Sequence, residues 1–203
     1  MDTNVLFPFS VMDLLLALSE DGVHTVVWTD ALLDEWERVI VEEQRRSPET
    51  AAAITSAIRS FFADSKVELA NYQHLIAEMP GPDPDDHHHS AAAIAGGATV
   101  LLTHNRADFP TKPLARRGLR VTDPDTYLCE LADELPDEVD ATVERLAGEK
   151  RRPPKSVADL LDDLARAGVT RFAAKLRPRL ADRSPPYGHD GASLDLEDVI
   201  RRH

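Results

Sequence analysis

The chain of 203 residues has little cysteine and no long apolar run. Its single cysteine, Cys129, excludes a disulfide framework and any zinc site built on several cysteines, and a reducing cytoplasm is the expected location. Charges interrupt every apolar stretch within about ten residues, well short of a membrane span. The N-terminus carries Asp2 and no basic segment, so we expect no signal peptide and no membrane association.

Positive charge is also scarce. The chain has 23 lysines and arginines against 36 acids, a net charge of −13, which taken alone argues against a nucleic-acid partner. The distribution is uneven, because residues 145–183 hold 11 basic and 5 acidic residues, whereas residues 1–144 hold 10 and 27. The basic segment is therefore either a phosphate-binding or acid-binding surface or an ordinary solvated helical surface.

Apolar residues make up 42% of the chain, enough for a core. Short β-branched or apolar segments alternate with helical patterns, which favours a three-layer α/β/α fold around a central parallel sheet. We expect this domain at 1–130 and a helical, partly basic extension with a loose tail at 131–203. The predicted strands are 3–7, 24–29, 66–70, 99–105 and 118–123. The predicted helices are 11–20, 29–46, 47–63, 90–98, 124–135, 134–150, 156–168 and 170–180.

Acidic residues recur where these elements begin or end. Asp2 opens the first strand, Glu35 lies early in the long helix after the second, and Asp86 opens the alanine-rich helix. Asn105 and Asp108 follow the TVLLT part (99–103) of the next strand. Ligands of parallel α/β sheets bind at the carboxyl edge of the strands. Four carboxylates from distant segments are therefore expected to meet at one edge.

Clustered carboxylates repel one another and raise each other's pKa values. A hard divalent cation such as Mg²⁺ removes this conflict, because it prefers oxygen ligands. Such an ion can activate water and hold phosphate oxygens. The pattern contains no obvious covalent nucleophile, so the sequence indicates hydrolysis of a phosphodiester by water.

Neighbouring acids compete for these roles. Asp34 and Glu37 are alternatives to Glu35 on the same helix. Asp85 and Asp86 can have separate roles. Asp85 would cap the helix, since aspartate is a good N-cap, and Asp86 would bind metal.

Three consecutive histidines, His87, His88 and His89, follow these acids. Successive helical residues point about 100° apart, so the three cannot all bind one ion. We expect one imidazole near the phosphate, with His87 as an accessory residue, and the other two at the surface.

Several segments resemble the PIN-domain ribonucleases, in particular the VapC-like toxins of type II toxin–antitoxin systems. The resemblance implies an RNA substrate, Mg²⁺ or Mn²⁺ as cofactor, and a cognate antitoxin as partner. It rests on DTNVLFP (2–8), LLDEWERV (32–39), DPDDHHHSAAAIAGGATVLLTHNRADFP (83–110) and GLRVTDPDTYL (118–128). It implies metal binding and catalysis for Asp2, Glu35, Asp86 and Asp108, and positioning of water or substrate by Asn105 and the accessory Asn4.

The chain departs from the family pattern at two points. Asp2 follows Met1 directly, where the family has several apolar residues, so the first strand is truncated or the natural start lies upstream. Asn105 stands where many relatives have an acid. Two alternatives therefore remain: an impaired PIN-fold protein that binds RNA or a partner, and a metal-dependent nuclease or phosphatase for another phosphate ester. The helix with Trp36 and the helix 47–63 could form a homodimer interface.

Overall fold

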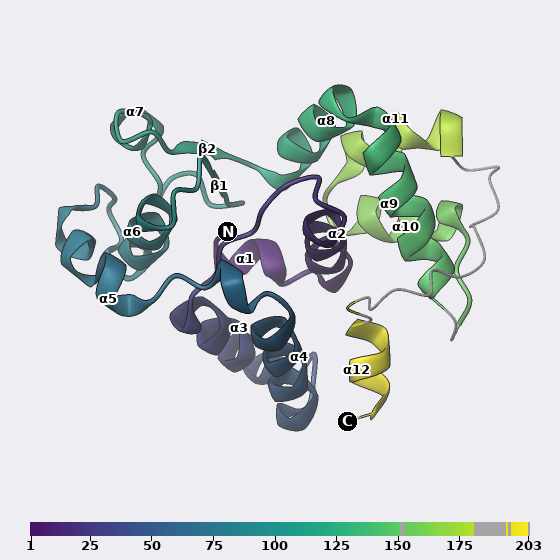
Figure 1. Ribbon diagram of the computed structural model, residues 1–203, viewed down its shortest axis with the longest axis horizontal. Coiled ribbons are helices and arrows are strands. Elements are labelled where there is room, and N and C mark those ends of the chain that lie inside the picture. Colours follow the sequence, from purple (N-terminus) through teal and green to yellow (C-terminus); the bar gives the residue numbers. More distant parts are fainter. Residues whose placement is uncertain (151–152, 181–193, 195, 203) are drawn as a thin grey trace. The chain divides into compact units, whose positions relative to one another are not determined.

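The computed structural model describes residues 1–150, 153–180, 194 and 196–202 (Figure 1). Internal contacts divide the chain into two compact units. Unit 1 contains Met1–Phe7 and Val27–Pro124, and unit 2 contains Pro8–Val26 and Asp125–Arg202. The two-domain division at residue 130 stays a prediction.

Unit 1 is mainly helical with a small parallel sheet, which confirms the predicted α/β class. Its strands are β1 (Val100–Leu102) and β2 (Arg120–Thr122). Its α-helices are α1 (Thr3–Leu6), α3 (Asp30–Glu42), α4 (Pro48–Phe61), α5 (Leu69–Tyr72), α6 (His87–Ala95) and α7 (Thr111–Ala115). Short 3₁₀ helices lie at Ala63–Ser65 (η1), Gln73–Glu78 (η2) and Pro84–Asp86 (η3).

The sheet pairs β1 with β2 in parallel, with Leu101 opposite Val121. The backbone N–H of Asp2 donates to the carbonyl of Leu102 at 2.9 Å, so the first residues run beside β1. The predicted strand 3–7 is wrong, because the chain turns into α1 directly after Asp2. A short apolar run fits a buried helix as well as a strand.

Two further strand predictions, 24–29 and 66–70, are also wrong as regular strands. These segments meet only in one parallel bridge between Trp28 and Lys66, with Val67 N–H donating to the Trp28 carbonyl at 2.8 Å. Leu69 already begins α5. The start of α5 therefore ends the ladder just after the bridge.

Helix α6 carries the acid-rich motif and lies in the core of unit 1. Ala93 packs with Leu101 of β1, whereas Ala91 and Ala92 pack with Val67 and other residues of a second cluster. At the end of the helix, a Cβ on Gly96 would lie 2.6 Å from Cγ2 of Val67. The small residues of this segment therefore serve close packing.

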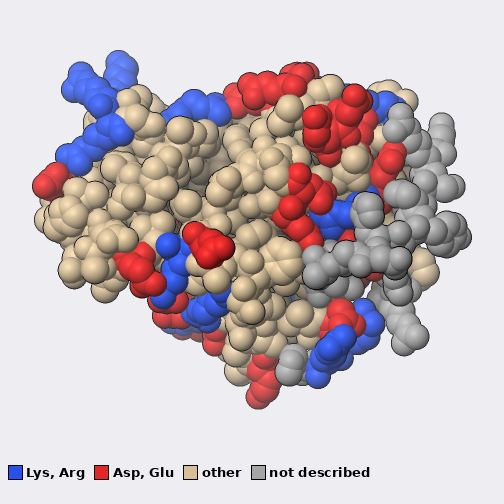
Figure 2. All heavy atoms as spheres, in the orientation of Figure 1, with Lys and Arg blue, Asp and Glu red and all other residues tan. Residues whose placement is uncertain are grey.

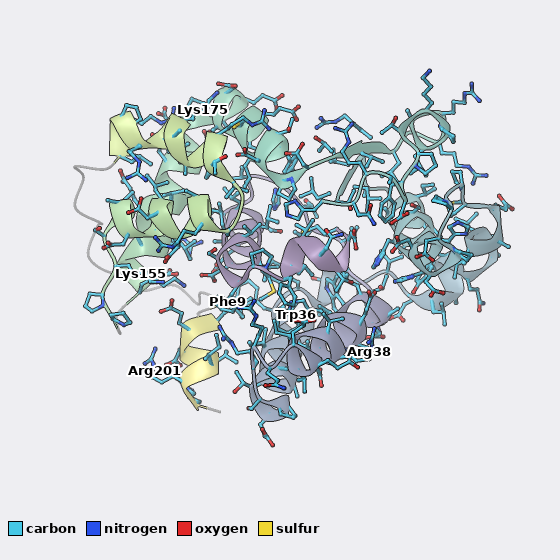
Figure 3. All side chains as sticks on the ribbon, turned by 180° about the vertical axis from the view of Figure 1, so that it is seen from behind. Phe9, Trp36, Arg38, Lys155, Lys175 and Arg201 are labelled. Carbon is cyan, nitrogen blue, oxygen red and sulfur yellow. The ribbon has the colours of Figure 1, made fainter. Side chains whose placement is uncertain are left out.

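Helix α3 presents Glu35 on one side and packs through Trp36 on another. Thr29 caps the helix, as its Oγ1 accepts from the Leu32 N–H at 3.1 Å. The indole N–H of Trp36 points toward α1 and donates to the Leu6 carbonyl at 3.0 Å (Figure 3). Trp36 is only 1% exposed, so it belongs to the core and cannot supply a dimer interface.

Unit 2 is helical in its described residues. Ser156 caps one helix through a reciprocal capping box with Asp159, as the sequence predicts. The helices are α2 (Phe9–Glu20), α8 (Pro124–Glu134), α9 (Pro136–Glu149), α10 (Val157–Arg166), α11 (Thr170–Leu180) and α12 (Leu196–Arg202). The sequence predictions did not include α12, and the loose segment expected at 182–193 lies outside the described residues. No described helix has the length and apolar character needed to cross a membrane.

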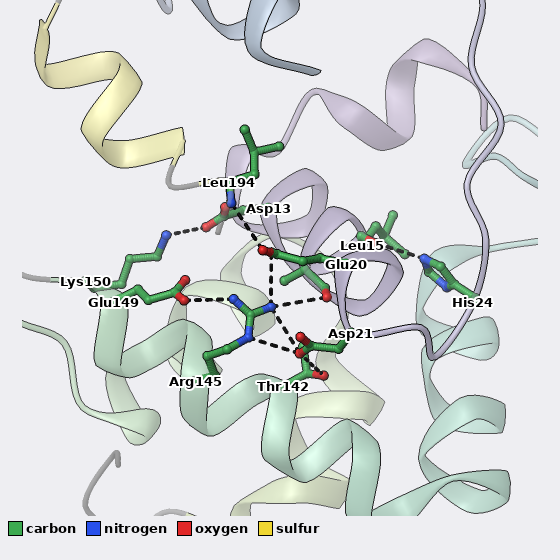
Figure 4. Close-up of polar contacts among 11 residues, drawn as sticks. Asp13, Leu15, Glu20, Asp21, His24, Thr142, Arg145, Glu149, Lys150 and Leu194 are labelled. Atoms are coloured by element: carbon green, nitrogen blue, oxygen red, sulfur yellow. Dashed lines mark hydrogen bonds and ion pairs between the residues drawn. The ribbon is translucent and has the colours of Figure 1, made fainter. Parts of the chain in front are cut away.

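The basic segment 145–183 is neutralised inside unit 2. Arg145 contacts Glu20, Asp21 and Glu149, and the buried Lys150 contacts the buried Asp13 at 2.5 Å (Figure 4). The other described cations of the segment also pair with acids of this unit: Lys155, Arg166, Arg171, Lys175, Arg177 and Arg179. On the face drawn in Figure 2, coloured basic and acidic side chains are interspersed without a broad basic surface. These pairs favour the alternative of an ordinary solvated helical surface for the described residues of this segment.

Candidate metal centre

Asp2 lies at the end of β1, and polar side chains hold its carboxylate in place. Its Oδ2 accepts from the Thr103 hydroxyl at 2.7 Å and from the Asn4 side-chain amide. The Thr103 oxygen in turn accepts from the Asn105 N–H at 2.8 Å, and Asn4 Oδ1 accepts from the His104 N–H at 3.0 Å. Asp2 is 5% exposed, so this network fixes a buried carboxylate.

The start of α6 lies beside Asp2 and contributes Asp86 and His89. They are three residues apart, so they share a helix face. Asp2, Asp86 and His89 each offer a ligand atom, and these atoms lie within 4.8 Å of one another. His89 Nε2 lies 3.7 Å from Asp2 Oδ1 and is buried, with no hydrogen-bond partner among the residues that the structure describes.

Glu35 extends the cluster from α3. Its Oε2 lies 3.4 Å from His89 Nε2 and 3.7 Å from His88 Nε2, and these three residues form a second group within 4.8 Å. The pKa of Glu35 lies below its ordinary value, chiefly because the His89 imidazole favours the carboxylate. The two alternatives to Glu35 have other partners. Asp34 pairs with Arg59 at 2.5 Å, and Glu37 accepts from Thr55 at 2.8 Å.

Asp86 is the most perturbed acid of the cluster. Its pKa rises from 3.8 to about 6, first because burial disfavours the charge and then because Asp2, Asp108 and Asp83 repel it. His89 opposes this rise. This is the electrostatic conflict that a divalent cation would relieve.

Asp108 and Asn105 lie at the rim of the cluster. Asn105 is exposed, and its amide donates to Asp108 Oδ2. Asp108 raises the pKa of Asp86 but belongs to neither group of converging ligand atoms. A Cβ on Gly81 would lie 2.6 Å from the Asp108 carbonyl oxygen, so the proline-rich loop packs tightly against this rim.

The remaining predicted residues are placed differently. Asp85 is exposed and lies outside both groups; its carbonyl contacts His88 Nδ1 at 2.6 Å. His87 Nε2 is directed to the Gly81 carbonyl at 3.2 Å rather than to the acids. The expectation that His88 and His89 lie at the surface is wrong, because His89 is 5% exposed and His88 is half-buried. His89 follows Asp86 by three residues, about one helical turn. This spacing could have identified His89 as a neighbour of Asp86 from the sequence alone.

Crowded carboxylates and buried imidazole nitrogens beside a small parallel sheet make this a candidate metal site on an α/β fold. A sequence model of the PIN domain matches residues 1–107, more than half of the chain, and a model of the VapC50 C-terminal domain matches residues 124–178. The chain belongs to the PIN-domain family. Together the two matches indicate a VapC-like nuclease toxin with a C-terminal extension, in a family that generally depends on divalent metal. No curated protein and no solved structure matches the chain.

Proposed function

We propose that this protein is a metal-dependent endoribonuclease and the toxin of a toxin–antitoxin pair. The observation that carries the proposal is the convergence of Asp2, Asp86 and His89 within 4.8 Å, with Glu35 beside them. A fixed carboxylate, a carboxyl group of raised pKa and an unpartnered buried nitrogen are the features expected of ligands that lack their cation. The donor set therefore fits a divalent ion.

Asp2, Glu35 and Asp86 would hold the ion, and Asp108 would contribute from the rim. When bound, Mg²⁺ or Mn²⁺ supplies an activated water and positive charge for the phosphate oxygens. Thr103 and Asn4 keep the Asp2 carboxylate oriented through their hydrogen bonds. The exposed Asn105 would orient the substrate or the attacking water beside Asp108.

RNA binding should itself require the cation, because a polyanion approaching clustered carboxylates is repelled. The cations of the segment 145–183 that the structure describes are engaged by acids of unit 2, so they are not assigned to phosphate contacts. The cognate antitoxin and a homodimer remain parts of this proposal without a mapped surface. The cytoplasm remains the proposed location.

The test compares RNA and DNA oligonucleotides, with a phosphomonoester as a third substrate, in the presence of Mg²⁺, Mn²⁺ or a chelator. We expect cleavage of RNA only, its loss with the chelator, and a loss of at least about 100-fold in Asp86→Asn, since even outer residues of metal sites cost 10- to 100-fold. Asp64→Asn, an exposed acid of unit 1, is the matched control. Cleavage of DNA or of the monoester would favour the other phosphate-ester activities, and no cleavage with any metal would favour an interaction protein.

Toxicity is tested separately. Induced expression of the wild-type chain should arrest growth, and Asp86→Asn should not. Co-expression of a small protein encoded beside it should relieve the arrest if that protein is the antitoxin. Arrest by both the wild type and Asp86→Asn would contradict a toxicity that depends on the metal centre.

A further inference from the structure

Two buried imidazole nitrogens face Glu35. Nε2 of His88 and Nε2 of His89 have no hydrogen-bond partner among the described residues, and they lie 3.7 and 3.4 Å from Glu35 Oε2. The His89 side chain is 2% exposed, so water does not replace the missing partner from bulk solvent. Buried polar atoms are normally paired, and an exception calls for an explanation such as an ion.

The second ring nitrogen of His88, Nδ1, also makes a contact, and this contact indicates which nitrogen carries the hydrogen. Nδ1 lies 2.6 Å from the Asp85 carbonyl, an acceptor, so Nδ1 carries a hydrogen. In the neutral ring, Nε2 then presents a lone pair toward the Glu35 carboxylate. Histidines that bind metals commonly donate their second nitrogen to a backbone carbonyl in this way.

The separations also fit one ion. Ligand atoms bound at about 2.1 Å to an octahedral ion lie about 3.0 Å apart as neighbours and about 4.2 Å apart across it. The two contacts of Glu35 Oε2, at 3.4 and 3.7 Å, fall within this range. The rings of His88 and His89 lie side by side, with centroids 3.9 Å apart, so both nitrogens can approach the same point.

We propose that Glu35, His88 and His89 form a nitrogen-donor site for a first-row transition dication, such as Mn²⁺ or Zn²⁺, in preference to Mg²⁺. Imidazole suits these ions, whereas Mg²⁺ is held by carboxylate, carbonyl and water oxygens. The same His89 nitrogen also lies beside Asp2 and Asp86, so their oxygens would complete the coordination of this one ion. The inference rests on the proposed function only for the presence of a cation among these acids.

The experiment uses the full chain freed of any histidine tag and titrated with Mn²⁺. Electron spin-echo envelope modulation of the bound ion detects directly coordinated nitrogen, and we expect ¹⁴N modulation in the wild type. His88→Gln and His89→Gln should each reduce this modulation and weaken Mn²⁺ binding by about 10- to 100-fold, more than they weaken Mg²⁺ binding. The exposed His74→Gln is the matched control and should leave both readouts unchanged.

Bound Mn²⁺ without nitrogen modulation in the wild type would overturn the inference, whatever the variants do. In that case His89 would act as a protonated counter-charge to the acids, and RNA cleavage could still occur, so the proposed function would stand. Nitrogen-coordinated Mn²⁺ without RNA cleavage would instead support the nitrogen-donor site and contradict the proposed function. Since the wild-type spectrum alone decides, a variant that fails to fold does not weaken the test.

Discussion

Removing the charge of Asp86 should stabilise unit 1 when no metal is present. The folded pKa of about 6 lies above the ordinary value of 3.8, so at pH 7 folding must hold a carboxylate where it is disfavoured. The difference corresponds to at most about 3 kcal/mol, and solvent screening of this half-buried side chain reduces it to about 1 kcal/mol. Asp86→Asn should therefore raise the free energy of unfolding by about 1 kcal/mol in a chelator at pH 7.

The sign of the pH dependence follows from the raised pKa. Because folded Asp86 binds its proton more tightly than the unfolded chain does, wild-type stability rises as pH falls from above 6 toward 4. The neutral Asn variant lacks this gain, so the difference between the two proteins should shrink between pH 7 and pH 5. Adding metal should reverse their order, since an ion at 100 times its Kd adds about 2.7 kcal/mol to the protein that binds it.

Tryptophan fluorescence is the appropriate assay, because both tryptophans, Trp28 and Trp36, lie buried in unit 1. Urea unfolding with chelator and with Mn²⁺, at pH 7 and pH 5, gives the four required comparisons. Asp64→Asn controls for loss of an exposed charge. An Asp86→Asn variant that is less stable than the wild type in chelator at pH 7 would refute the electrostatic reasoning.

Two further perturbations test the packing of each unit. Lys150→Met removes the lysine that pairs with the buried Asp13 carboxylate and should cost about 3–5 kcal/mol by urea unfolding followed by circular dichroism, with much of the loss recovered in the Asp13→Leu/Lys150→Met double variant. An equal loss in the single and double variants would contradict this origin. Gly96→Ala places a methyl group 2.6 Å from Val67 Cγ2 and should cost about 1–3 kcal/mol by tryptophan fluorescence, unless Val67 can turn aside without loss.

The sequence predicted that Asp2, Glu35 and Asp86 would meet because each was expected near the end of a strand or the start of a helix. The structure groups Asp2 and Asp86 with His89, and Glu35 with the same histidine. The expected surface position of His88 and His89 was wrong. Both rings turn toward a carboxylate from another helix. That carboxylate, on Glu35, lies more than fifty residues away in sequence, so rotamer choice at His88 and His89 was not predictable from their own segment.

The predicted strands and the basic segment show a second limit of prediction from the sequence. Short apolar runs such as 3–7 do not distinguish a strand from a buried helix by periodicity. The positive charge of 145–183 is visible in the sequence, but its neutralisation depends on acids as distant as Asp13, Glu20 and Asp21 of unit 2. Contacts across more than a hundred residues determine whether a basic segment is available to a phosphate.

The carboxylates of the candidate metal centre differ from the other buried acids in the positive charges that surround them. In unit 2 the buried Asp13, Asp125 and Asp140 each pair with lysine or arginine. Among the residues that the structure describes, no lysine or arginine pairs with Asp2 or Asp86. Since lysine and arginine neutralise acids elsewhere but not here, on the proposed function a bound metal ion would be the positive charge that this centre offers to a phosphate. RNA affinity, and not only the cleavage rate, should therefore fall when the metal is removed.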